Sequence, residues 1–186
     1  MAMIPKHRRK TSRRGFTILE ALIAAVVLAV GMIGLLGFFV ASVSAIQNSQ
    51  EELLARQKAR ETLESIFAAR NSQQITFDGI NNAASGGIFL DGPQPLRDAG
   101  NDGLFDTADD SGVETIVLPG PDGVLGTSDD TVRTLSEFQR EIRITPLNRS
   151  DGTLNPDLRE VVVTISYSTP GGLRSYSTAG YVSRFR

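Results

Sequence analysis

The 186-residue chain contains no cysteine and one histidine, His7, and its 19 Lys and Arg nearly balance its 21 Asp and Glu. Without cysteine it cannot form disulfides, and beyond the N-terminal segment it lacks Cys–His and Ser–His nucleophiles and the usual zinc ligands. We therefore predict no catalytic residues and no enzymatic activity. The charge is uneven, because residues 1–15 hold six Lys and Arg and no acid.

A long apolar segment follows this basic stretch. From Arg14 to Glu51 the only charged residue is Glu20. A bilayer core about 30 Å thick needs about 20 apolar residues as a helix, so residues 16–46 are long enough to span it. Basic residues beside a span remain cytoplasmic, which places the N-terminus inside and residues 47–186 outside, in the periplasm. This topology explains the basic cluster better than nucleic-acid binding does.

Glu20 is unexpected within the apolar segment, because a carboxylate in lipid costs at least about 2.5–3.5 kcal/mol. One interpretation places it at the lipid headgroups beside Arg13 and Arg14. The wider string gives another. Residues 15–24, Gly-Phe-Thr-Ile-Leu-Glu-Ala-Leu-Ile-Ala, come after a basic leader and open a long apolar helix. This combination resembles the leader junction of type IV pilins and type II secretion pseudopilins.

The resemblance implies specific processing and assembly residues. In that family prepilin peptidase cuts after the glycine, here Gly15, and the new N-terminal residue, here Phe16, is N-methylated. The glutamate corresponding to Glu20 is thought to pair with the N-terminal amine of a neighbouring subunit. Such a partner would offset the cost of burying a lone carboxylate. An ordinary signal peptide cleaved near Val43-Ser44-Ala45 is less well supported, because the apolar segment is about twice the usual 7–15 residues and contains an acid.

The apolar segment and the residues after it predict one helix over about residues 16–70. Residues 47–70 keep an apolar stripe at helical spacing, with charged residues on the other face. Three glycines interrupt the apolar half: Gly31, Gly34 and Gly37. They serve either close helix packing, since small residues let backbones approach, or a segment that loosens during assembly, since each glycine weakens a helix.

Residues 71–136 are predicted to be loop-rich, with a short strand at 113–118. They contain an internal repeat, in which residues 102–110 and 122–130 share the pattern Asp-Gly-apolar-apolar-x-Thr-small-Asp-Asp. Oxygen ligands around a glycine turn are typical of calcium loops, although the pattern is not an EF-hand. The repeats are either calcium sites or two polar turns. The candidate ligands are Asp98, Asp102, Asp106, Asp109, Asp110, Asp122, Asp129 and Asp130.

Residues 137–186 predict an antiparallel sheet. Apolar and polar residues alternate after Phe138 and again from Val161, and a turn is expected at Thr169-Pro170-Gly171-Gly172. Residues 148–157 are expected to form a polar connector. The fold class is therefore α+β and pilin-like, with a long N-terminal helix packed on a C-terminal antiparallel head that carries a loop-rich insertion. The C-terminal region resembles minor pilins of the PilV kind.

These observations predict a structural, minor subunit of a type IV pilus or type II secretion pseudopilus. Its expected partners are other pilin or pseudopilin subunits, prepilin peptidase and an inner-membrane assembly platform. It requires no cofactor, with calcium as the one candidate ligand. The predicted parts are a cleaved leader (1–15), an inner-membrane or filament-core helix (16–46) and a head (47–186). The alternative is a permanently anchored, calcium-stabilised binding or adhesion module that does not polymerise.

Overall fold

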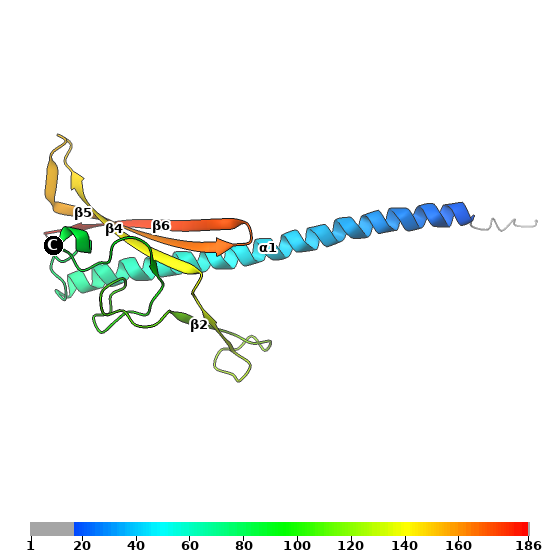
Figure 1. Cartoon of the computed structure of the whole chain (residues 1–186), viewed down its shortest axis with the longest axis horizontal. Helices are drawn as coiled ribbons and strands as arrows, with labels where there is room; N and C mark the ends of the chain where they lie inside the picture. Colours follow the sequence, from blue (N-terminus) through cyan, green and yellow to red (C-terminus); the bar gives the residue numbers. More distant parts are fainter. Residues whose placement is uncertain (1–16, 186) are drawn as a thin grey trace, which may run out of the picture. The chain divides into compact units, whose positions relative to one another are not determined.

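The computed structural model describes residues 17–185, which form a long helix packed on an antiparallel sheet (Figure 1). This pilin-like α+β fold confirms the predicted class. The elements are α1 (Ile18–Asn71), η1 (Ala83–Ser85), β1 (Gln94–Pro95), β2 (Thr115–Leu118), β3 (Thr131–Thr134), β4 (Phe138–Asn148), β5 (Leu154–Thr169) and β6 (Gly172–Ser183).

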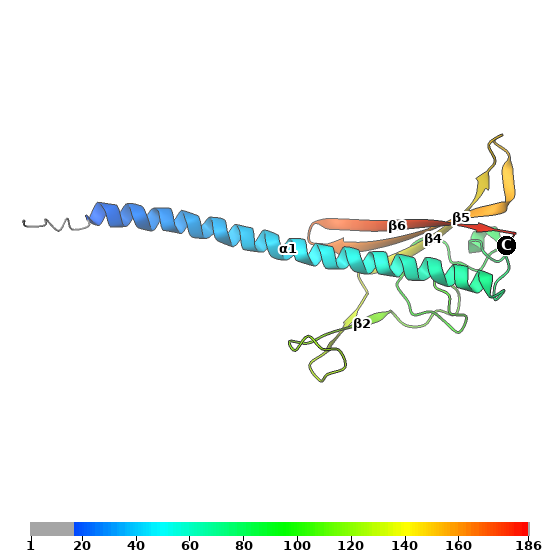
Figure 2. The ribbon, with the colours of Figure 1, turned by 180° about the vertical axis from the view of Figure 1, so that it is seen from behind.

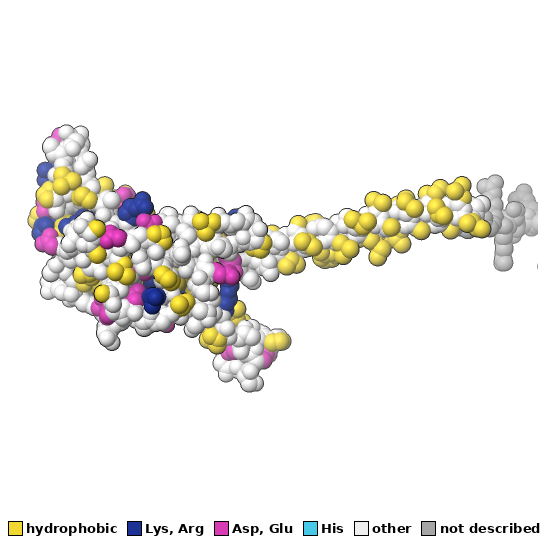
Figure 3. Space-filling view, viewed as in Figure 1, with side chains coloured by type: hydrophobic (Ala, Val, Ile, Leu, Met, Phe, Trp, Pro, Cys, Tyr) yellow, Lys and Arg dark blue, Asp and Glu magenta, His cyan; other side chains and the backbone are white. Residues whose placement is uncertain are grey.

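The chain divides between Ala45 and Ile46 into two compact units. In the first unit the described residues belong to α1, and their apolar side chains are almost all exposed, as Figure 3 shows along this part of the helix. By length and composition α1 could cross a membrane. It continues through Gly31, Gly34 and Gly37 without a break, in agreement with the single predicted helix.

In the second unit, the C-terminal part of α1 covers one face of the sheet (Figure 2). The helix faces the sheet with mostly small side chains, which lets the two backbones approach closely. The buried apolar residues of α1 are Ala55, Ala59, Ile66 and Ala69. At one position the sheet also needs a residue without a side chain, because a Cβ at Gly180 would lie 2.6 Å from Phe67 Cζ and 3.2 Å from Leu63 Cδ1. Glycine therefore lets α1 pass directly over β6.

The main sheet has the order β1-β4-β5-β6, and all its pairs are antiparallel. Phe138 pairs with Tyr167 and Ile142 with Val163, so the alternating apolar residues of both strands share the helix-facing side, as predicted. The predicted turn joins β5 to β6. The predicted connector at 148–157 is too long, because β5 begins at Leu154, which pairs with Asn148 beyond an irregularity near Pro146.

The loop-rich region covers the outer edge of β4. The short strand β1 pairs with Gln139 and Arg140. Farther along, the side chain of Asn82 donates to the Ile142 carbonyl at 2.7 Å and accepts from the Ile144 amide at 2.8 Å. The opposite edge of the sheet is β6, and among residues 17–185 no further strand pairs with it. One edge is thus covered and the other is open.

The strand predicted at 113–118 is present as β2, which pairs with β3 in a separate two-stranded sheet. The second acidic repeat connects these two strands. Arg133 of β3 forms an ion pair with Glu51 of α1 at 2.8 Å, which ties the hairpin to the helix.

Candidate assembly site and the duplicated acidic loops

The first turn of α1 is capped by Thr17. Its Oγ1 accepts a hydrogen bond from the Glu20 amide at 3.2 Å, which is the first half of a capping box, Thr-x-x-Glu. This start signal is visible in the sequence as Thr17 three residues before Glu20. Glu20 therefore has a local role in addition to the predicted pairing, since a carboxylate in the first turn also interacts favourably with the helix dipole.

The side chain of Glu20 is exposed. The processing residues Gly15 and Phe16 lie outside the described residues. A Cβ added at any of the three helix glycines would meet nothing within 4 Å, so the single chain itself does not require glycine there. Their role, like that of Glu20, stays a prediction.

The two acidic repeats fold into nearly the same loop. In the first, the Asp102 amide donates to Asp109 Oδ2 at 3.3 Å and the Leu104 amide to Asp102 Oδ1 at 2.8 Å. In the second, the Asp122 amide donates to Asp129 Oδ2 at 3.3 Å and the Val124 amide donates to Asp122 Oδ1 at 2.8 Å. The repeated sequence therefore encodes a repeated conformation, held by carboxylates that accept backbone N–H groups.

The structure extends the repeat by a glycine that the sequence analysis missed. A Cβ at Gly100 would lie 2.3 Å from Asp109 Cγ, and one at Gly120 would lie 2.3 Å from Asp129 Oδ2. Both loops close over this position, so no larger residue fits. The constant 20-residue offset of these glycines was visible in the sequence.

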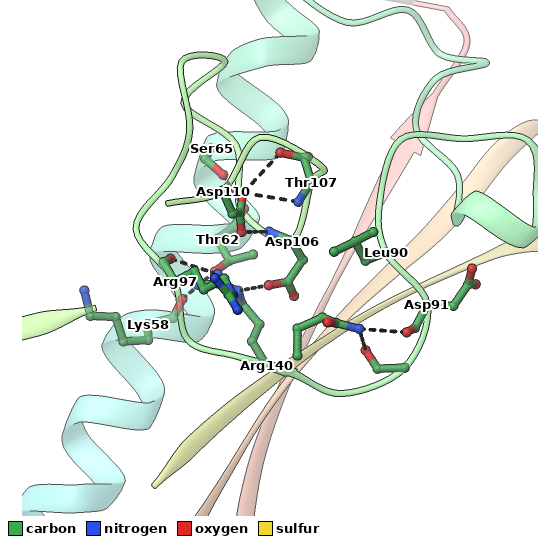
Figure 4. Close-up of polar contacts among 12 residues, drawn as sticks. Lys58, Thr62, Ser65, Leu90, Asp91, Arg97, Asp106, Thr107, Asp110 and Arg140 are labelled. Atoms are coloured by element: carbon green, nitrogen blue, oxygen red, sulfur yellow. Dashed lines mark hydrogen bonds and ion pairs between the residues drawn. The ribbon is translucent and has the colours of Figure 1, made fainter. Parts of the chain in front are cut away.

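The repeats differ at their fifth position, where the backbone has a positive φ in both. In the second loop this residue is Gly126, whereas in the first it is Asp106, which is buried. Arg140 Nε donates to Asp106 Oδ1 at 3.0 Å, as Figure 4 shows. Arg140 Nη2 also donates to the Arg97 carbonyl at 3.3 Å, and its guanidinium lies 4.4 Å from the Phe105 ring centre. The first loop is thereby attached to β4.

Burial raises the pKa of Asp106 to about 6, because desolvation outweighs the opposing effect of Arg140, and Asp110 adds to the rise. A hydrogen bond from the Thr107 hydroxyl lowers the pKa of Asp109, and one from the Thr127 hydroxyl lowers the pKa of Asp129. The repeats therefore contain carboxylates whose pKa values shift in opposite directions, upward at Asp106 and downward at Asp109 and Asp129. Nothing in the local sequence marks Arg140 as the partner of Asp106, because the two residues are 34 positions apart.

Most of the candidate calcium ligands have carboxylates that are engaged within the protein. Asp106 faces Arg140, and Asp110 accepts from the Asp106 and Thr107 amides. Asp130 accepts from the Gly126 amide at 2.6 Å. Asp98 lies just before the first loop, where its backbone bonds with that of Ser111 and Gly112. In the described part of the chain no three acidic or histidine side chains are grouped as a metal site. Calcium binding stays a prediction.

A second buried charge cluster links α1 to the start of β2. Lys58 donates to Glu61 at 2.9 Å and to Glu114, and both Lys58 and Glu114 are buried. Desolvation lowers the pKa of Lys58, but the two carboxylates raise it by more, so the side chain stays charged. This cluster attaches the hairpin region to the head and points to no chemistry of its own.

Residues 10–36 match the prokaryotic N-terminal methylation motif. The motif includes Gly15, Phe16 and Glu20 and extends into the exposed apolar part of α1. No curated protein and no solved structure matches the chain. The methylation motif and the pilin-like fold together support a type IV pilin-like chain with an apolar helix suited to membrane anchoring.

Proposed function

We propose that this protein is a structural subunit of a type IV pilus or a type II secretion pseudopilus, present as a minor component. The observation that carries the proposal is the methylation motif over residues 10–36, continuous with a helix whose apolar side chains are exposed. An apolar helical surface of this length needs lipid or other helices around it. Prepilin peptidase would cut after Gly15, and Phe16 would be methylated.

Opposite charges on two neighbouring subunits would drive the assembly step. Cleavage creates an α-amino cation on Phe16, next to Thr17 at the N-terminus of α1. The positive N-terminal end of the helix dipole repels this cation, and a nearby carboxylate offsets the repulsion. When apolar helices pack side by side, the amine of one subunit and Glu20 of the next neutralise each other in a low dielectric. A wrong axial stagger would leave both charges buried and unpaired, which is strongly unfavourable.

The remaining partners follow from the same proposal. The subunit would be stored in the inner membrane with its N-terminus in the cytoplasm and its head in the periplasm. It would pass through an assembly platform into a filament of pilin-type subunits. Gly31, Gly34 and Gly37 would let neighbouring helices approach, or let the helix loosen as it leaves the membrane.

The decisive experiment is mass spectrometry of the protein isolated from membranes of its native host. The proposal expects a chain that starts at Phe16 and carries one methyl group on the new N-terminus. A Gly15→Leu variant should keep residues 1–15, and it serves as the matched control. A wild-type chain that keeps its first 15 residues would contradict the proposal and support a permanently anchored binding or adhesion module instead.

A further inference from the structure

The two copies of the acidic loop place their apolar pair differently. In the first copy Leu104 is 1% exposed and Phe105 is 8% exposed, whereas in the second Val124 is 55% and Leu125 is 62% exposed. The hydrogen bonds that shape the two loops are nearly the same. The second loop therefore presents an ordered apolar pair that no described part of this chain covers.

The hairpin that carries the second loop exposes further apolar residues, namely Val117, Leu118 and Val132. A two-stranded sheet by itself is marginally stable in water. An exposed apolar patch on such an element is typical of an interaction surface. The space-filling view shows this hairpin as a projection that carries both hydrophobic and acidic side chains (Figure 3). Its acids are Asp122, Asp129 and Asp130.

The first copy shows what kind of surface this loop type contacts. Leu104 belongs to the hydrophobic core, and the Phe105 ring lies 4.4 Å from the guanidinium of Arg140. The observed contact surface is therefore apolar with an arginine at its side. A docking surface for the second copy should likewise be apolar, and because Gly126 and Leu125 replace Asp106 and Phe105 there, a cation on that surface would face the acids of the loop.

The head has an open groove of this kind beside the uncovered edge of β6. Its volume is about 310 Å³, and it is lined by Phe67, Arg70, Asn71, Tyr181, Val182, Ser183 and Phe185. Tyr181 and Phe185 are largely exposed. Arg70 Nη2 donates a hydrogen bond to the Arg184 carbonyl at 3.0 Å. Among residues 17–185, Arg70 Nε is buried without an acceptor and no carboxylate forms an ion pair with Arg70. The groove thus combines aromatic surface with an arginine that has no acidic partner among residues 17–185.

Loop and groove lie at opposite ends of the head. The hairpin is tied to Glu51, near the start of the head part of α1, and the groove lies at Phe67–Asn71 near its end. These positions are roughly 16–20 residues apart, or about 24–30 Å along a helix. A contact between two different patches of this kind is head-to-tail, and it produces an open filament when it does not close into a ring.

We propose that the loop of residues 119–130 docks into the groove beside Arg70 of a second copy of this protein. Val124 and Leu125 contact the aromatic lining, and the negative charge of the loop faces Arg70. The inference rests on the proposed function, because a head-to-tail contact joins two copies whose apolar helices lie in the same filament. Two adjacent copies suffice for one such contact.

The absence of native cysteine makes the contact testable by crosslinking of the full-length protein in native membranes. Two differently tagged chains are expressed together, one with Leu125→Cys and one with Ser183→Cys, and treated with a short bis-maleimide. We expect a mixed dimer, which is lost when the second chain also carries Arg70→Glu. Replacing Ser183→Cys by Leu173→Cys, at the far end of β6, should give no dimer. Arg60→Glu, a charge reversal outside the groove, should leave the dimer intact.

A Val30→Cys pair in the apolar helix separates failure of this inference from failure of the proposed function. Helix crosslinks and a methylated Phe16 without the Leu125–Ser183 dimer would overturn the docking contact and leave the filament subunit in place. Loss of all crosslinks with residues 1–15 retained would overturn both. A Leu125→Cys adduct on a different pilin-type subunit, identified by its peptides, would overturn the assignment of a second copy as the occupant.

Discussion

Arg140 and Asp106 form an ion pair whose two side chains are almost completely buried, with a 3.0 Å hydrogen bond from Nε to Oδ1. Among residues 17–185, Asp106 Oδ2 and Arg140 Nη1 are buried without partners, so the pair depends on this one contact for charge compensation. Arg140 occupies an inward position of β4 between Phe138 and Ile142. The pair therefore fixes the first acidic loop on the sheet.

We expect Asp106→Ala to destabilise the protein by about 3–5 kcal/mol, because it leaves a buried guanidinium without its counter-ion. The measurement is urea unfolding of the full-length chain in detergent, followed by tyrosine fluorescence. The double variant Arg140→Met with Asp106→Asn should recover much of the loss, since it removes both charges and Asn tolerates a positive φ. Equal stability of Asp106→Ala and wild type would show that the ion pair is not needed.

The same pair predicts an unusual pH dependence. The folded pKa of Asp106 is about 6 against an ordinary value of 3.8, so between these values the folded state binds more protons than the unfolded state. Stability should therefore fall as pH rises from about 4 to about 6, by up to about 3 kcal/mol at 1.36 kcal/mol per pKa unit. Asp109 and Asp129, whose folded pKa values are lowered, contribute the opposite slope below that range.

Urea midpoints measured at several pH values check this expectation. The Asp106→Asn variant should lose the decline between pH 4 and 6 and keep the loss of stability at lower pH. A wild-type protein whose stability rises steadily across pH 4–6 would contradict the assigned direction.

We expect Glu20→Ala to remove assembly while leaving membrane insertion intact. Taking an acid out of an apolar helix eases insertion, but it leaves the Phe16 amine of a neighbouring subunit without its partner. The measurement is the yield of Val30→Cys crosslinks in membranes, with the intact mass as a check on processing. Glu52→Ala provides the control, because Glu52 is only partly buried on the same helix and forms an ion pair only with Arg56 in the described chain. Normal crosslinking of Glu20→Ala would remove the reason for the predicted charge pairing.

Gly180→Ala should destabilise the head by about 1–3 kcal/mol, the usual cost of overpacking. The added methyl group would lie 2.6 Å from Phe67 Cζ and 3.2 Å from Leu63, so α1 or the ring has to move. Gly171→Ala is the matched control, because its Cβ would lie at an ordinary 3.7 Å from Thr169 Oγ1. Urea midpoints compare the two. If both substitutions cost the same, the close approach of α1 to β6 is not the cause.

Calcium binding by the duplicated loops would be weak, because their carboxylates already accept backbone hydrogen bonds that a metal would have to replace. We expect dissociation constants in the range of about 10⁻⁴–10⁻³ M that extracellular calcium modules show. Titration calorimetry of the full-length chain measures this. The Asp129→Asn and Asp130→Asn double variant should remove the signal of the second loop only. The absence of any heat at millimolar calcium would end the calcium hypothesis.

Local pattern was enough to predict several elements. The composition of residues 16–46 requires a helix in lipid, and α1 begins at Ile18 and ends at Asn71, close to the predicted bounds. The alternation after Phe138 and from Val161 determined which side of each strand faces inward, and Pro170-Gly171 marked the turn before β6. The repeat at a 20-residue offset likewise predicted two similar loops. These features depend on residues that are close together in the chain.

Contacts between distant segments decided the rest. Arg140 reads as a polar residue in an alternating strand, and it is buried only because Asp106, 34 residues earlier, reaches it. In the sequence Asn82 is an ordinary loop residue, and only the tertiary structure shows that its side-chain amide bonds to the backbone of Ile142 and Ile144 in β4. Val124 and Leu125 match Leu104 and Phe105 in the sequence, yet one pair is exposed and the other is buried. Periodicity predicts which face a side chain occupies, whereas tertiary packing determines what lies against that face.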